Sequence, residues 1–190
     1  TKTLLYQRPD LMHQLLAKNA EAVTLYLNAQ IAAGAQAVMV FDTWGGMLTG
    51  PAYAEFSLAY AARVFAGVTR AAEGRTVPRI FFTKGGGHWL KGMTATGADA
   101  LGLDWQTDLH DAWHRVGNKV ALQGNLDPSV LFAPATTIER EAARIVSAFG
   151  DNPGHVFNLG HGISQFTAPE NVEVLASAVR RESSRVRNSA

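Results

Sequence analysis

The sequence predicts an α/β fold built on a parallel sheet, and two observations support that prediction. Five short, almost continuously apolar runs, typical of strands buried on both faces, lie at residues 37–42, 79–83, 100–105, 119–123 and 155–159. Segments with helical periodicity accompany them at residues 8–33, 54–67, 87–96, 108–116, 137–149 and 169–181. Strands that alternate with helices pair in parallel through right-handed crossovers. The last dozen or so residues are polar, and we expect a fraying tail there.

The sequence just after each predicted strand distinguishes an open doubly wound sheet from part of a closed barrel. Each strand ends in polar or glycine-rich sequence, namely DTWGG at 42–46, TKGGG at 83–87, DWQ at 104–106, QGNLD at 123–127 and GHG at 160–162. An open sheet gathers its ligand contacts at one switch point, whereas a barrel distributes them over all its βα loops. The sequence therefore predicts a partial (β/α)8 TIM barrel of about five strand–helix units, with about three more expected upstream of residue 1.

Composition excludes several classes of function. The chain has 190 residues, is 47% hydrophobic and carries a formal net charge of +1, so charge gives no reason to expect nucleic acid or an anionic membrane as partner. No apolar run is long enough for a membrane span, and no secretion signal opens the sequence, so we expect a cytoplasmic protein. The absence of cysteine excludes disulfides, thiolate nucleophiles and sulfur-ligated zinc.

The strand-end motifs each permit a functional and a plain interpretation. Gly85-Gly86-Gly87 is either a phosphate cradle or, as its spacing favours, a tight turn, and Lys84 either meets a substrate carboxylate or is solvated. Thr43 either donates to a substrate anion or caps a turn in which Asp42 binds local N–H groups. The residues alone leave the Asp42-Thr43 alternatives open.

Three of the six histidines lie where they can bind a ligand. His110 and His114 have the i, i+4 spacing of a zinc pair, but no glutamate lies between them, so chance surface histidines are favoured. His161 differs because it lies between two glycines directly after a buried strand. Its imidazole can therefore face an active cleft.

Taken together, four of these strand ends form a pattern with the order and spacing of one family. They are VFDTWGG at 40–46, GLDW at 102–105, LQGNLDP at 122–128 and NLGHG at 158–162. This pattern resembles the C-terminal portion of the uroporphyrinogen decarboxylases, and TKGGG at 83–87 resembles the bacterial form. The resemblance implies that residues 1–190 are the C-terminal part of a single decarboxylase barrel domain.

The resemblance also implies a cofactor-free carboxy-lyase of porphyrin and haem biosynthesis that acts as a homodimer. Four acetate side chains of uroporphyrinogen become methyl groups, which gives coproporphyrinogen and carbon dioxide, with no metal or organic cofactor. The family's arginine-rich segment, ring-centring aspartate and tyrosine would lie upstream of residue 1. We therefore expect no catalytic residue within these 190 and no activity from this chain alone.

Two substrate-binding residues carry over from the family to this sequence. They are Thr43, the hydroxyl residue after the first strand, and His161 of the Gly-His-Gly motif. Phe41 is a further candidate for contact with the apolar face of the macrocycle.

Two other functions compete with this one. A corrinoid-dependent methyltransferase of similar fold would bind zinc through histidine and cysteine, and a chain without cysteine cannot build that site. A non-catalytic binding or scaffold half-barrel remains open for this polypeptide.

Overall fold

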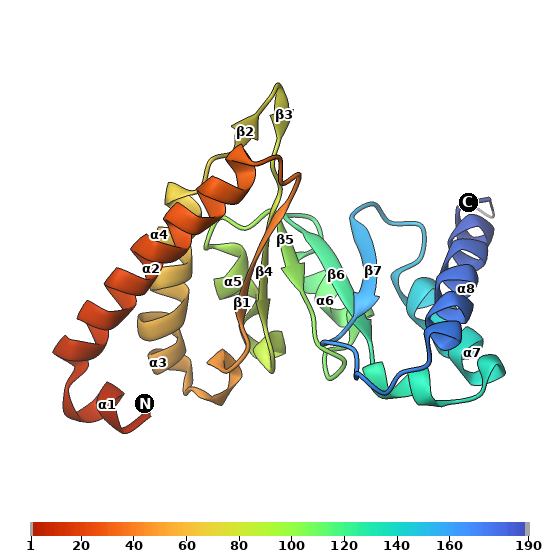
Figure 1. The fold of residues 1–190 in the computed structure, drawn as a ribbon. Coiled ribbons are helices and arrows are strands. Elements are labelled where there is room, and N and C mark those ends of the chain that lie inside the picture. Colours follow the sequence, from red (N-terminus) through yellow and green to blue (C-terminus); the bar gives the residue numbers. More distant parts are fainter. Residues whose placement is uncertain (1, 189–190) are drawn as a thin grey trace. The chain divides into compact units, whose positions relative to one another are not determined.

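The computed structural model describes residues 2–188, and the chain divides into two compact units, Thr1–Leu101 and Gly102–Ala190. Both units combine parallel strands with helices (Figure 1). The predicted α/β class is therefore confirmed.

The first unit contains the elements up to strand β5. They are α1 (Lys2–Gln7), α2 (Pro9–Ala32), β1 (Val38–Asp42), η1 (Gly45–Met47), α3 (Gly50–Tyr53), the π-helical turn η2 (Ala54–Leu58), α4 (Ala59–Gly67), β2 (Ala71–Ala72), β3 (Arg75–Thr76), β4 (Arg79–Thr83), η3 (Gly86–Trp89), α5 (Leu90–Thr94) and β5 (Ala100–Gly102), whose last residue belongs to the second unit.

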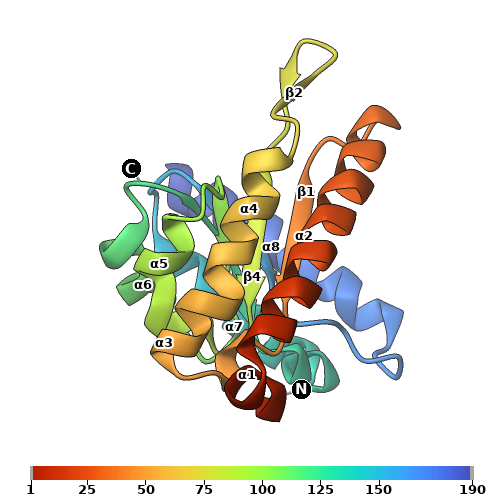
Figure 2. The ribbon, with the colours of Figure 1, turned by 90° about the vertical axis from the view of Figure 1, so that its left-hand side faces the viewer.

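Strands β1 and β4 pair in parallel over their whole length, and β5 follows β4 in the hydrogen-bonded order. Helices α2 and α4 lie side by side beside them (Figures 1 and 2). Helix α2 begins at Pro9, where a missing N–H costs nothing, and buries Leu27 and Ile31 in a cluster with Val38 and Val64. This cluster fixes β1 against both helices.

Three features of the first unit were not predicted. Helix α1 precedes α2, and a short antiparallel hairpin, β2–β3, precedes β4 and projects from the end where β4 begins (Figures 1 and 2). The helix predicted at 54–67 begins earlier, at Gly50, and its early part is a π-helical turn.

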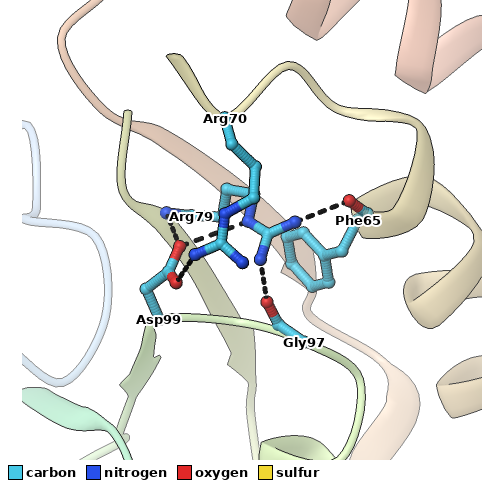
Figure 3. A network of polar contacts seen from close by, with 5 residues as sticks. All are labelled: Phe65, Arg70, Arg79, Gly97 and Asp99. Atoms are coloured by element: carbon cyan, nitrogen blue, oxygen red, sulfur yellow. Dashed lines mark hydrogen bonds and ion pairs between the residues drawn. The ribbon is translucent and has the colours of Figure 1, made fainter. Parts of the chain in front are cut away.

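A buried arginine organises the N-terminal end of β4 (Figure 3). Arg79 is 4% exposed, and its Nε lies 3.2 Å from Oδ2 of Asp99. Its Nη1 donates to the carbonyl of Phe65 at 2.7 Å, and its Nη2 donates to the carbonyl of Gly97. Arg70 adds a 2.5 Å contact to the other oxygen of Asp99. Because each partner has its own fixed position, the guanidinium joins α4, β4 and the segment before β5.

The second unit contains α6 (Leu109–Val116), β6 (Ala121–Leu126), η4 (Pro128–Phe132), α7 (Ala135–Phe149), β7 (His155–Leu159) and α8 (Pro169–Asn188). Strands β6 and β7 pair in parallel. The Asp108 side chain caps α6 by accepting from the N–H of Asp111 at 2.7 Å. Helix α7 buries Ile138, Ala142 and Ile145, which repeat at helical spacing.

The prediction of a fraying tail at the end of the chain is wrong, because α8 continues to Asn188. Arg181 and Arg185 both pair with Glu182, and Arg181 also reaches Glu139 of α7 at 3.4 Å. Polar residues with such pairs and good helix propensity extend a helix without an apolar stripe.

Candidate functional site

The turn after β1 carries Thr43, the first predicted substrate contact. Asp42 ends β1 in register with Thr83, the last residue of β4, while Phe41 lies in register with Phe82. Neighbouring residues of a strand point to opposite faces, so Asp42 and Thr83 share one face and the two phenylalanines share the other. Thr43 is partly buried, and its hydroxyl makes no hydrogen bond with any residue among 2–188.

The Asp42 carboxylate is bound by two groups. Ser57 Oγ, from the π-helical turn η2, donates to Oδ2 of Asp42, and the backbone N–H of Gly45 donates to the same carboxylate. Burial raises the pKa of Asp42, and the two donated hydrogen bonds partly oppose that rise. Gly45 is required there, since a methyl group would overlap the carboxylate and lie 2.8 Å from Cε2 of Tyr53.

A second pair of hydroxyls lies beside this carboxylate. Tyr53 is fully buried, its OH lies 2.7 Å from Oγ1 of Thr83, and its ring stacks on Trp89 with centroids 4.3 Å apart. Burial raises the pKa of Tyr53 to about 12, and the nearby Asp42 charge adds to the rise. Tyr53 is therefore a neutral hydroxyl at physiological pH.

The glycines after β4 serve a tight turn, the interpretation that their spacing favoured. Gly85 has φ 72°, in the left-handed region, and Gly46 of the preceding loop leaves no room for a methyl group against the Lys84 carbonyl. The β1 and β4 loops thus touch through backbone.

Beside the β1 end lies a mostly apolar cavity of about 340 Å³, lined among others by Val40, Asp42, Phe56, Ser57 and Tyr60. Phe41 and Trp44 are 64% and 71% exposed. Large aromatic side chains with so much free surface are available to a flat apolar ligand.

In the second unit His161 follows β7, as predicted. His161 is exposed and lies edge-on to the Trp105 ring, with centroids 6.3 Å apart and planes at 87°. Gly160 is buried, and a methyl group there would lie 2.9 Å from the carbonyl carbon of Asp104. Gly162 has open space around it. The first glycine of the motif therefore permits close backbone packing, which sets His161 beside Trp105.

The loop that carries Trp105 is fixed by polar side chains. Asp104 is 1% exposed, and its Oδ1 accepts from the Gln106 N–H at 3.2 Å and from Thr107 Oγ1 at 3.1 Å. Nδ2 of the buried Asn125 donates to the carbonyls of Asp104 at 2.7 Å and Thr107 at 2.5 Å. The amide group of Asn125, in the strand end at 123–127, thus binds backbone carbonyls of the 104–107 loop.

Other histidines have different surroundings. His155 Nε2 bonds to the Gly124 carbonyl at 2.9 Å, and burial lowers the pKa of His155. His110 and His114 are exposed, with their Nε2 atoms 3.0 Å apart. No cluster of three or more histidine, aspartate or glutamate side chains suited to a metal ion occurs within residues 2–188.

Thr43 and His161 both follow the carboxyl end of a parallel strand, one in each unit. Reasoning from the sequence missed Ser57 and Tyr53 as partners of the β1 and β4 ends. Their four-residue spacing places them on one helix face, but that face alone does not reveal which strand end it meets.

A family model described as uroporphyrinogen decarboxylase (URO-D) matches residues 1–182. The chain is 60% identical over 186 residues to the uroporphyrinogen decarboxylase of Azoarcus sp., with 98% of this chain and 52% of the relative covered. It is 59% identical over 180 residues to the uroporphyrinogen decarboxylase of an Escherichia coli strain, covering 95% and 51% respectively. The chain thus spans about half the length of the curated relatives it matches.

Among solved structures, a methyltransferase from Methanosarcina mazei has a TM-score of 0.82 and 22% sequence identity, with 95% of this chain and 52% of that chain covered. This likeness establishes the fold alone, and it agrees with the predicted partial barrel. Within the described residues no helix combines the length and hydropathy needed to cross a membrane.

Proposed function

Because the chain belongs to the uroporphyrinogen decarboxylase family, we propose that it forms part of an enzyme that converts uroporphyrinogen to coproporphyrinogen. The observation that carries the proposal is the match over residues 1–182, at about 60% identity to decarboxylases. The likeness to a methyltransferase supports no second activity, since at 22% identity it concerns the fold only.

The proposed reaction removes four acetate carboxyl groups as carbon dioxide and leaves methyl groups. Protonation of a pyrrole carbon makes the ring a cationic electron sink, which accepts the electron pair of the breaking C–C bond. A second proton is then added to the side-chain carbon, which becomes a methyl group, and the ring carbon releases the first proton to restore the pyrrole. The substrate thus supplies the electron sink for which other decarboxylases need a cofactor. The protein binds the macrocycle and moves protons, as a cytoplasmic homodimer.

Thr43 and His161 are proposed as contacts to substrate carboxylates. The Thr43 hydroxyl has no partner among residues 2–188, so its proton is available for donation. The exposed position of His161 gives a ligand access to its ring, and a neighbouring carboxylate favours protonated imidazole. Phe41, which is 64% exposed, offers an apolar face to the ring system.

A chimera tests the proposal. This chain replaces the matching 186 residues of the Azoarcus relative, and coproporphyrinogen formation is measured against the unmodified relative. We expect the chimera to form coproporphyrinogen with no added metal or cofactor. The 190-residue chain by itself is expected to show no turnover, because it spans about half the length of its relatives. A folded chimera without turnover would contradict the proposed function. Steady turnover by a monodisperse 190-residue chain would contradict the expectation that this chain contains no catalytic residue.

A further inference from the structure

Four polar side chains from four elements meet where β1 and β4 end. Asp42 of β1 and Thr83 of β4 lie in register, Ser57 comes from η2 and Tyr53 from α3. Ser57 binds Asp42, and Tyr53 binds Thr83 at 2.7 Å. These four residues form the strand-end cluster, and two of them, Asp42 and Thr83, directly precede Thr43 and Lys84 in the sequence.

The π-helical turn brings Ser57 to Asp42. A π-helical turn holds one more residue than an α-helical turn, and such turns occur frequently at functional sites. Ser57 lies within this turn, and its hydroxyl reaches a carboxylate 15 residues earlier in the chain. On the same turn Glu55 bonds to Nε2 of His13 at 3.0 Å instead. The two contacts are therefore separable by mutation.

Asp42 also closes the turn in which Thr43 lies. Its carboxylate accepts from the N–H of Gly45, so residues 42–45 form a closed loop with Thr43 inside it. Gly45 is packed between that carboxylate and the Tyr53 ring. Any displacement of the carboxylate is thus transmitted to the backbone on both sides of Thr43.

We propose that Asp42 is a positioning residue for Thr43, held in place by Ser57, so that the strand-end cluster fixes the direction in which the Thr43 hydroxyl points. The inference deepens the proposed function, since it takes Thr43 as a substrate contact. A side chain serving packing alone would be apolar at this partly buried position, because an ionised carboxylate loses solvation there. The hydrogen bonds that Ser57 and Gly45 donate to the carboxylate offset this loss, which explains why an aspartate occupies the position.

A double-mutant cycle in the chimera tests the proposal. Ser57→Ala removes the donor to Asp42 without changing any residue of the turn at 42–45. We expect KM for uroporphyrinogen to rise about three- to tenfold, the factor that corresponds to the loss of one hydrogen bond, with kcat nearly unchanged. Ser57→Thr restores the hydroxyl and should return KM towards the parent value. In a Thr43→Val background, Ser57→Ala should add almost nothing, because both changes act through one hydroxyl.

Glu55→Gln is the matched control, since it alters the same π-helical turn on its His13 side and should leave KM unchanged. The proposal would be overturned if Ser57→Ala had equal effects on KM in the parent and in the Thr43→Val background. It would also be overturned if Ser57→Ala left KM unchanged in the parent.

Amide hydrogen exchange gives a measurement that does not depend on turnover. The proposal requires faster exchange at residues 43–45 in Ser57→Ala than in the parent or in Glu55→Gln. Unchanged exchange at this turn would refute the positioning role even in an active enzyme. Faster exchange in a chimera without decarboxylase activity would instead leave the positioning of residues 43–45 supported and count against the proposed function.

Discussion

The two ends of β4 carry buried polar residues with very different roles. At the N-terminal end Arg79 binds one carboxylate and two backbone carbonyls, and these bonds join neighbouring elements (Figure 3). At the C-terminal end Thr83 belongs to the strand-end cluster, next to a turn that carries a proposed substrate contact. In barrels of this kind the N-terminal end of a strand serves stability and the C-terminal end serves chemistry. Burial alone therefore does not tell which role a polar residue has.

The largest effect on stability is expected at the N-terminal end. Arg79→Met should lower the free energy of unfolding by about 3 kcal/mol, because Asp99 loses a buried partner and two carbonyls lose their donors. Urea denaturation of the chimera measures the loss, and kcat/KM of the folded fraction should not change. Arg70→Met is the control: the Arg70 side chain is 58% exposed, and its loss should cost less than about 1 kcal/mol. Equal losses would show that Arg79 has no special role.

At the C-terminal end Thr43→Val should affect kinetics rather than stability. Valine keeps the shape and removes the donor, so kcat/KM should fall by the equivalent of about 1–3 kcal/mol, the cost of losing a hydrogen bond to a charged group. The melting temperature should stay close to that of the parent, because the hydroxyl has no partner among residues 2–188. Unchanged kinetics in a stably folded variant would show that Thr43 only caps its turn and does not contact the substrate.

A smaller kinetic effect is expected at His161, which also follows a strand. His161→Asn keeps one hydrogen-bonding end and loses the titrating ring, so partial activity should remain with a weaker pH dependence. Since His161 is exposed, stability should hardly change. A large drop in melting temperature combined with normal kinetics would exclude a substrate contact there.

The smallest effect is the pH dependence contributed by Asp42. Burial raises the pKa of Asp42 in the folded protein, so the folded state holds this proton more tightly than the unfolded state does. The contribution to stability is therefore fully present below the unfolded pKa and falls as pH rises through the raised pKa. Asp42→Asn removes this dependence, and the free energy of unfolding of the variant, relative to the parent, should increase over the pH range from the unfolded pKa up through the raised folded pKa. A constant difference across that range would contradict the assignment.

Much of the fold could be predicted because buried strands are nearly continuous apolar runs. Strands β1, β4 and β7 lie within a residue of their predicted bounds, whereas the strand predicted at 100–105 ends at Gly102. Asp104 accounts for that difference, since its carboxylate binds Gln106 and Thr107 and turns the chain. The two-residue strands of the β2–β3 hairpin are too short to show a period.

The candidate site was predictable in position but not in its contacts. Thr43 and His161 lie at strand ends, as their place after apolar runs indicated. The contact of Ser57 with Asp42 depends on a π-helical turn, and a hydrophobic pattern with helical period does not distinguish that turn from a regular helix.

The π-helical turn η2 also has a consequence for alignments and for engineering. Its wider turn absorbs one extra residue, so deleting one position within 54–58 can restore a regular helix without greatly rotating α3 relative to α4. Tyr53 of α3 and the buried residues of α4 would then keep their faces towards the strands, whereas the bulged residues themselves would be rearranged. A single-residue gap in this helix should therefore act on the contact between Ser57 and Asp42 more than on the fold. Homologues that carry such a gap are expected to have lost the serine–aspartate pair as a unit.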